Sequence, residues 1–222
     1  MRIDILSLFP NMFDGFLNES IIKRARENGF VDINVVNFRD YTLDSHNKVD
    51  DTPYGGGAGM VLMIQPIYDC LRAIKGDDSY VVLLSPSGRT FNQRRANVLK
   101  NYKHLILICG HYEGFDDRIK MLIDDEISIG NFVVTGGEVP AMLICDAVVR
   151  LIPGVISSDS LDFESFDGEL LDYPVYTKPR CFNGMKVPDV LLSGDHKKIS
   201  EYRNSERIRV TNLKREMEED GI

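Results

Sequence analysis

Residues 128–140 combine the residue types that suit the binding of a small organic molecule. Gly130, Gly136 and Gly137 allow positive φ and a close approach of the backbone to a ligand. The apolar residues 132–134 lie between them and can line a pocket. The chemistry that this pattern favours is ligand binding by backbone groups, so we expect this stretch to form one wall of a pocket.

Two other glycine-bearing loops, residues 85–89 and 110–114, each follow a short apolar segment, 80–84 and 104–109. Short, wholly apolar strands are typical of parallel sheets, in which both faces are buried. Ligands of such sheets bind beyond the carboxyl ends of the strands. We therefore expect these two loops and residues 128–140 to share one pocket.

Known phosphate-binding patterns do not explain these loops, whose nearby basic side chains are Arg89, Arg118 and neutral His111. The glycine-rich stretch 49–60 is not a Walker loop, because no Gly-Lys-Ser/Thr follows, and a loop rather than a strand precedes it. Two interpretations remain open for it. It is either a flexible surface loop or a backbone-lined contact for an anion or nucleotide, with Asp50-Asp51 nearby.

An α/β fold with a mostly parallel sheet would position the three loops. Alternating or wholly apolar segments indicate strands, and apolar residues at helical spacing indicate helices. Glu138 and Pro140 suit the first turn of a helix. The expected strands are 2–8, 31–38, 80–84, 104–109 and 126–129, and the expected helices are 13–28, 65–74, 93–101, 116–123 and 138–151.

Composition indicates a cytoplasmic globular protein. The chain has 222 residues, 43% of them hydrophobic, which suffices for an ordinary core. No run approaches the roughly 20 apolar residues of a membrane span, and residues 1–5 begin a strand rather than a signal peptide. The four cysteines are far apart, so free buried thiols are expected rather than disulfides or a metal site; they are Cys70, Cys109, Cys145 and Cys181.

The distribution of charge matters more than the net charge of −8, which taken alone argues against a nucleic-acid partner. Residues 176–215 carry ten Lys and Arg against four acidic residues, whereas residues 159–172 carry six acidic residues and no basic one. Helices at 197–203 and 207–215 would form a basic module for a nucleic-acid backbone. The alternative is a solvated charged surface. The expected domains are 1–158, an acidic linker 159–175 and a basic helical domain 176–222.

Eight segments, in order along nearly the whole chain, carry a resemblance to a known family. The sequence resembles the bacterial tRNA (guanine-N1)-methyltransferases that modify position 37, beside the anticodon. The matching segments are Leu6-Ser7-Leu8-Phe9-Pro10-Asn11-Met12-Phe13, Val49-Asp50-Asp51-Thr52-Pro53-Tyr54-Gly55-Gly56-Gly57, Leu84-Ser85-Pro86-Ser87-Gly88-Arg89, Cys109-Gly110-His111-Tyr112-Glu113-Gly114, Ser128-Ile129-Gly130, Gly136-Gly137-Glu138, Arg150-Leu151-Ile152-Pro153-Gly154-Val155 and Tyr176-Thr177-Lys178-Pro179.

The resemblance implies a methyltransferase of the SPOUT class, with a mostly parallel sheet, a C-terminal trefoil knot and a small α-helical C-terminal domain. It also implies a homodimer that acts on tRNA with guanosine at positions 36 and 37. The resemblance places S-adenosylmethionine in the knot, in contact with Pro86, Gly110, Tyr112, Glu113, Ser128, Ile129, Gly130, Asn131, Phe132, Val133, Val134, Gly136, Gly137 and Pro140.

Methylation at guanine N1 requires removal of the N1 proton and stabilisation of the charge that gathers at O6. A carboxylate can act as the base and an arginine suits O6. The resemblance assigns the arginine to Arg150 and the base to Glu164, where the family usually has aspartate; Asp162 and Asp167 are neighbouring alternatives. It implies Mg²⁺ as a candidate activator and assigns tRNA contacts to Asp50, Tyr54, Gly56, Asp172, Ser193, His196 and Arg203.

Two functions other than methyl transfer are alternative interpretations of the sequence. A non-catalytic RNA-binding protein that keeps the fold would be consistent with glutamate at position 164 in place of aspartate. An NAD oxidoreductase would need a Gly-x-Gly-x-x-Gly turn near the N-terminus, and residues 7–13 contain none.

Overall fold

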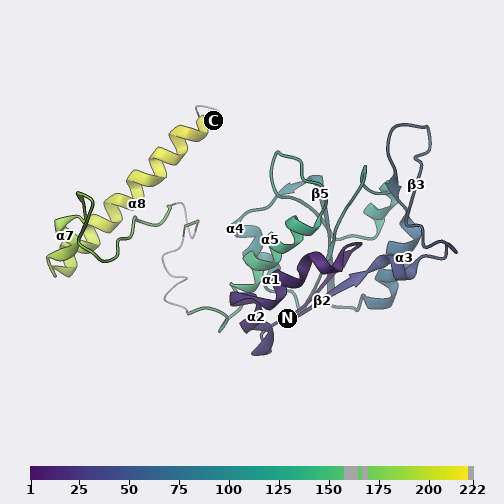
Figure 1. Ribbon diagram of the computed structural model, residues 1–222, viewed down its shortest axis with the longest axis horizontal. Coiled ribbons are helices and arrows are strands. Elements are labelled where there is room, and N and C mark those ends of the chain that lie inside the picture. The colour runs from purple at the N-terminus through teal and green to yellow at the C-terminus, as the bar shows by residue number, and fades with distance from the viewer. Residues whose placement is uncertain (158–164, 167–169, 220–222) are drawn as a thin grey trace. The chain divides into compact units, whose positions relative to one another are not determined.

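The computed structural model describes residues 1–157, 165–166 and 170–219, which fall into two compact units (Figure 1). We call Met1–Ile156 the N-terminal unit and Ser157–Ile222 the C-terminal unit, and we describe each by itself. The proposed base Glu164 and its alternatives Asp162 and Asp167 lie outside the described residues.

The N-terminal unit is built on a five-stranded, wholly parallel sheet with the order β2-β1-β6-β5-β7. All five predicted strands are present, which confirms the α/β class. Every residue of the central strand β6 is buried, as expected for a strand covered on both faces. The strands are β1 Arg2–Ser7, β2 Asp32–Asn37, β5 Ser79–Thr90, β6 His104–Ile108 and β7 Asp125–Ser128.

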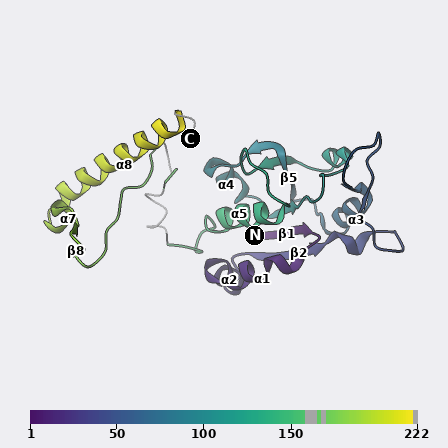
Figure 2. The ribbon, with the colours of Figure 1, turned by 45° about the horizontal axis from the view of Figure 1, so that its top comes forward.

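Helices cover the sheet in two groups (Figures 1 and 2). Helix α5 contacts helices α2 and α4 and packs on strand β1, so these three helices form one layer over the sheet. Helix α3 lies apart from them, and its residues Ile67 and Cys70 pack in a buried cluster with Leu6 and Ile106 of the sheet. The bounds are α1 Asp14–Asn18, α2 Ser20–Glu27, α3 Ile64–Ile74, α4 Gln93–Leu99 and α5 Glu138–Val149.

Two helices of the N-terminal unit differ from the prediction. The helix expected at 13–28 is interrupted, because Glu19 is extended and Ser20 has a φ of 52°. A 3-10 turn, η1 Pro10–Phe13, precedes α1. The helix expected at 116–123 is the short 3-10 helix η3 Asp117–Met121, and another 3-10 turn, η2 Phe38–Tyr41, follows β2.

The glycine-rich stretch 49–60 joins two short antiparallel strands, β3 Asp50–Asp51 and β4 Val61–Leu62. The backbone of this hairpin is tied to the loop after β6. The Leu62 amide donates to the Gly114 carbonyl at 2.9 Å, and the Glu113 amide donates to the Met60 carbonyl at 3.0 Å. This end of the stretch is therefore fixed to one of the three pocket loops.

The C-terminal unit contains a hairpin, a short helix and one long helix. A single helix replaces the two predicted at 197–203 and 207–215, because no glycine or proline interrupts residues 196–219. Ion pairs of Glu206 with Arg209 and of Lys214 with Glu218 lie along it. The elements are β8 Cys181–Phe182, β9 Met185–Lys186, α7 Asp189–Leu192 and α8 His196–Glu219.

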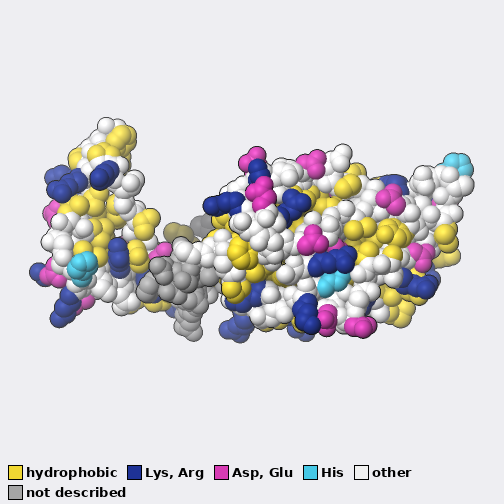
Figure 3. Space-filling view, turned by 90° about the horizontal axis from the view of Figure 1, so that it is seen from below, with side chains coloured by type: hydrophobic (Ala, Val, Ile, Leu, Met, Phe, Trp, Pro, Cys, Tyr) yellow, Lys and Arg dark blue, Asp and Glu magenta, His cyan; other side chains and the backbone are white. Residues whose placement is uncertain are grey.

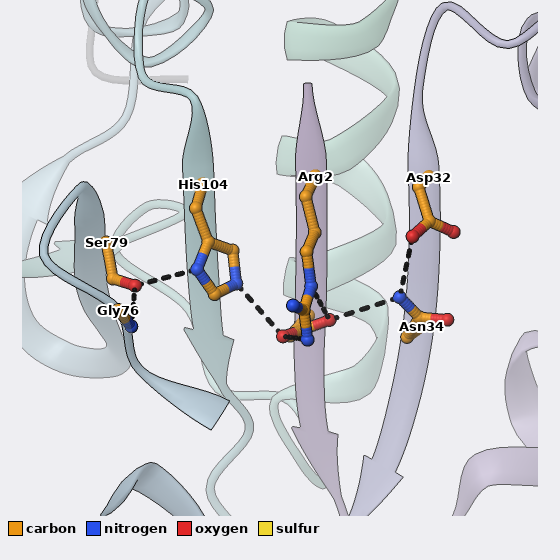
Figure 4. Close-up of polar contacts among 7 residues, drawn as sticks. Arg2, Asp32, Asn34, Gly76, Ser79 and His104 are labelled. Carbon is orange, nitrogen blue, oxygen red and sulfur yellow. Dashed lines mark hydrogen bonds and ion pairs between the residues drawn. The ribbon is translucent and has the colours of Figure 1, made fainter. Parts of the chain in front are cut away.

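A polar network crosses the amino edge of the sheet, opposite to the carboxyl edge where the pocket is expected (Figure 4). At its centre the Asp4 carboxylate is completely buried. It accepts hydrogen bonds from Arg2 Nη2 at 2.6 Å, His104 Nε2 at 2.9 Å and Asn34 Nδ2 at 3.3 Å. The other ring nitrogen of His104 lies 2.7 Å from Ser79 Oγ. The network thus links the first residues of neighbouring strands.

Replacement of Asp4 by alanine is expected to lower the free energy of unfolding by about 3 kcal/mol, because the buried His104 ring loses its acceptor and Arg2 loses its ion pair. Urea denaturation measures the change. Asp32→Ala is the matched control, since Asp32 is exposed and its side chain accepts from Asn34 at 3.2 Å. The control is expected to lose less than about 0.5 kcal/mol. Equal losses in the two variants would show that burial of Asp4 is not the cause.

Candidate ligand-binding site

The three predicted loops surround one cavity of about 450 Å³ at the carboxyl edge of the sheet. This volume lies in the range of small-molecule sites. Of the fourteen residues predicted to contact a ligand, only Asn131, which is exposed, is not part of the lining. The cavity is lined by the other thirteen: Pro86, Gly110, Tyr112, Glu113, Ser128, Ile129, Gly130, Phe132, Val133, Val134, Gly136, Gly137 and Pro140. Their role in binding stays a prediction.

Strand β5 interrupts its pairing with β7 to form the first loop. The register shifts between Leu84 and Arg89, after which the strand pairs again, with Arg89 opposite Ile127. A side chain at Gly88 is excluded, because its Cβ would lie 2.4 Å from the backbone nitrogen of Ile127. Residues 85–87 therefore leave the sheet and line the cavity, whereas the sequence predicted that the strand ends at residue 84.

Gly137 holds the third loop against the second. Its amide donates to the Gly110 carbonyl at 2.8 Å. A Cβ at Gly137 would lie 2.5 Å from Cα of Cys109 and 2.6 Å from the amide nitrogen of Gly110. The φ of Gly137 is −80°, so close approach rather than conformation requires glycine here. Gly130 has a φ of 140°, and so confirms that a glycine of this loop adopts a positive φ.

Glu138 fixes the start of α5 from beneath the cavity. Its side chain is 2% exposed and accepts a hydrogen bond from Ser7 Oγ at 2.7 Å. Ser7 Oγ accepts in turn from the Phe9 amide at 2.9 Å. A carboxylate in the first turn of a helix is stabilised by the helix dipole. The Ser7–Glu138 contact spans 131 positions of sequence, and sequence reasoning missed it.

Charged side chains give the cavity an acidic character. Three carboxylates line it, those of Glu113, Asp117 and Glu126, against one ammonium group, that of Lys120. Lys120 forms an ion pair with Asp117 at 2.6 Å. Sequence reasoning missed Asp117, Lys120 and Glu126, and the only signal for them was their place between the second and third loops. Such a lining disfavours a phosphate and suits a ligand that carries positive charge.

An aromatic group borders the cavity beside the second loop. The ring of His111 lies 4.9 Å from those of Phe9 and Tyr112, measured between centroids. Tyr112 has a φ of 58°, which turns the chain sharply at this point. His111 Nδ1 is buried and has no hydrogen-bond partner among the residues that the structure describes. Burial raises the pKa of the neighbouring Cys109 thiol well above its usual value, so this thiol stays protonated.

Those of the other predicted site residues that the structure describes do not line this cavity. Tyr54 and Gly56 lie on the glycine-rich hairpin, where Tyr54 is fully exposed. Arg150 directly follows α5, and Glu164 is not among the described residues. Four others belong to the C-terminal unit: Asp172, Ser193, His196 and Arg203. Ser193 follows the last residue of α7, and His196 and Arg203 lie on α8.

Metal and membrane sites are not evident in the part of the chain that is described. Within residues 1–157, 165–166 and 170–219, no three His, Cys, Asp or Glu side chains come together as metal ligands. In the same ranges no helix is both long and apolar enough to cross a bilayer. Cys70, Cys109 and Cys145 are buried free thiols, as predicted, whereas Cys181 is exposed.

The sheet and its cavity define an α/β protein with a cavity of small-molecule size at the carboxyl edge of parallel strands, which is where such sheets bind their ligands. Comparison with known sequences specifies the family. The profile described as tRNA (Guanine-1)-methyltransferase TrmD matches residues 1–218, and the chain belongs to this family.

Curated relatives match along almost their whole length. A tRNA (guanine-N(1)-)-methyltransferase of Malacoplasma penetrans is 61% identical over 215 residues, which cover 97% of this chain and 95% of the relative. Proteins of the same name from Dictyoglomus turgidum and Ureaplasma urealyticum are each 56% identical over 216 residues. These two alignments cover 97% of this chain, and 88% and 95% of the respective relatives.

Proposed function

We propose that this chain transfers a methyl group from S-adenosylmethionine to N1 of guanosine 37 in tRNA. Methylation of tRNA guanine at N1 is the reaction of the family to which the chain belongs. The observation that carries the proposal is the cavity formed by the three glycine-bearing loops, in a chain that matches the family from residue 1 to residue 218.

The residues around the cavity fit S-adenosylmethionine, which supplies an electrophilic methyl group on a positively charged sulfur when bound. Phe132, Val133 and Val134 offer apolar contact for the adenosine part. Backbone groups near Gly110 and Ile129 can hydrogen-bond the base and ribose. The carboxylates of Glu113 and Glu126 favour a cationic ligand over an anionic one.

Two further residues carry the proposed proton chemistry. Glu164 removes the N1 proton of guanine as general base, and Asp162 and Asp167 are the alternatives. Arg150 stabilises the negative charge that develops at O6, for which its fixed fork of donors is suited. This assignment rests on the match to the family, since Arg150 follows the end of α5 that is about 18 Å of helix away from the cavity.

The trefoil knot, the homodimer, the cytoplasmic location and the three domains 1–158, 159–175 and 176–222 also belong to the proposal. Exposed apolar side chains on the third loop and α5, such as Val133, Val139 and Leu143, support an interface between two copies. Activation by Mg²⁺ also belongs to the proposal, with no ligand residues assigned to it.

Methyl transfer is expected when the purified protein is incubated with labelled S-adenosylmethionine and an unmodified tRNA transcript that has guanosine at positions 36 and 37. Nuclease digestion of the product is expected to yield N1-methylguanosine. The same transcript with adenosine at position 37 is the matched control and is expected to take up no label. Label on the control, or no N1-methylguanosine in the first reaction, would refute the proposed function.

A further inference from the structure

A second cavity, of about 550 Å³, lies wholly within the C-terminal unit. Its walls come from the extended segment 173–178, from residues flanking the β8–β9 hairpin, from α7 and from the first turns of α8. Leu191, Leu192 and Ile199 supply apolar surface. The fold has thus placed an apolar hollow inside the most basic region of the sequence.

The charged side chains that line this cavity, among the residues that the structure describes, are all positive. They are Lys178, Arg180 and Arg203, and no described Asp or Glu lines the cavity. Within the described part of the C-terminal unit, none of these three cations forms an ion pair. Lys198 and Arg209 of α8, by contrast, are paired with carboxylates at 3.3 and 2.7 Å. The face drawn in Figure 3 likewise shows Lys and Arg beside hydrophobic side chains on this unit.

An aromatic platform completes the cavity. The guanidinium carbon of Arg203 lies 4.8 Å from the centroid of the Tyr173 ring, and Tyr176 also lines the hollow. The segment that carries these tyrosines is anchored just before Tyr173. The Leu171 amide donates to Thr211 Oγ1 at 2.9 Å, and Arg207 Nε donates to the Leu171 carbonyl at 3.1 Å. The platform is therefore held to α8 before any ligand binds.

We infer that this cavity binds one unpaired nucleotide of the tRNA, other than guanosines 36 and 37. Unstacked bases bind to aromatic rings and to arginine planes, which Tyr173 and Arg203 provide. The unpaired cations Lys178 and Arg180 suit the phosphates beside that base. An acidic peptide would match the cations but would make no specific use of the stacking surface. The inference rests on the proposed function, because tRNA is the partner that it names.

The test is a scan of single abasic sites. A tRNA substrate is synthesised with one base removed at each unpaired position in turn, and its affinity for the full chain is measured by filter binding. We expect one position outside 36 and 37 to lower the affinity of the wild-type protein about 5- to 100-fold. Tyr173→Leu keeps apolar volume but loses the ring, and we expect it to bind the intact tRNA weaker by a similar factor.

In the Tyr173→Leu variant the same abasic site is expected to cause no further loss, which a double-mutant cycle reveals. Lys197→Ala is the matched control, because Lys197 is an exposed cation on α8 that does not line the cavity. This control is expected to show the full position-specific loss of the wild type. Circular dichroism verifies that each variant is folded.

Two results would overturn the inference. One is that no abasic position outside 36 and 37 lowers the affinity of the wild-type protein more than twofold. The other is that folded Tyr173→Leu shows the same position-specific loss as the wild type. Methyl transfer by the wild-type protein to the intact tRNA is measured in parallel. If no methyl transfer is observed, the proposed function is refuted, but a coupling between Tyr173 and one abasic position would still support the cavity as a nucleotide site. If methyl transfer is observed and no such coupling is found, only the inference about the cavity is refuted.

Discussion

Replacement of Glu164 by glutamine is expected to lower kcat for methyl transfer about 10²- to 10⁴-fold, the usual contribution of a general base. Glutamine keeps the size of the side chain but cannot take the N1 proton of guanine. KM for tRNA is therefore expected to change less than threefold. Single-turnover kinetics with saturating S-adenosylmethionine and tRNA separate the chemical step from binding.

Three companion variants test whether the base is residue 164. Glu164→Asp restores the residue that is usual in the family and is expected to keep activity. Asp162→Asn and Asp167→Asn remove neighbouring carboxylates and are expected to stay within about threefold of the wild type, since neither would be the base. If one of these two lost activity while Glu164→Gln kept it, the base would have to be reassigned to that aspartate.

Gly137→Ala is expected to abolish measurable binding of S-adenosylmethionine and to lower the free energy of unfolding by about 1–3 kcal/mol, as overpacking does. The new Cβ would lie 2.5 Å from Cα of Cys109, so two backbone segments would have to separate. The separation would also break the hydrogen bond from the Gly137 amide to the Gly110 carbonyl. Calorimetry measures the binding, and urea denaturation measures the stability.

Gly15→Ala is the matched control for this effect. Gly15 lies in helix α1, and nothing within 4 Å of its position would meet an added Cβ. Alanine there is expected to leave cofactor binding unchanged and to stabilise the helix by up to about 1 kcal/mol. Binding by Gly137→Ala within threefold of the wild type would show that the contact between the second and third loops does not shape the site.

The sequence was sufficient to predict the strands and the loops that follow them. Short apolar runs such as 104–109 indicate buried strands, and glycines that follow such strands indicate loops that approach a ligand. The loops around the cavity were therefore predictable from the pattern, and the family resemblance supplied thirteen of the lining residues. Asn131 does not line the cavity, and Asp117, Lys120 and Glu126 line it without having been predicted, because membership of a loop does not determine which of its side chains face a cavity.

Features that depend on contacts far apart in sequence were not predictable. Nothing local pairs Ser7 with Glu138, and nothing local ties Leu62 to Gly114. The break between helices α1 and α2 was also missed, because Ser20 adopts a left-handed backbone conformation that cannot be predicted from a serine. The second cavity draws its cations from an extended segment, the hairpin region and a helix, so charge counting located the basic region but not the hollow within it.

The renewed pairing of β5 with β7 after residue 88 has a consequence for ligand binding. Because Leu84 and Arg89 both pair with the same residue, Ile127, the loop between them is closed at its base by the sheet itself. Its ends cannot drift apart unless the pairing at Arg89 and Thr90 is lost. Most of the conformational entropy of this wall is thus lost during folding rather than on ligand binding, so S-adenosylmethionine would meet a preorganised surface.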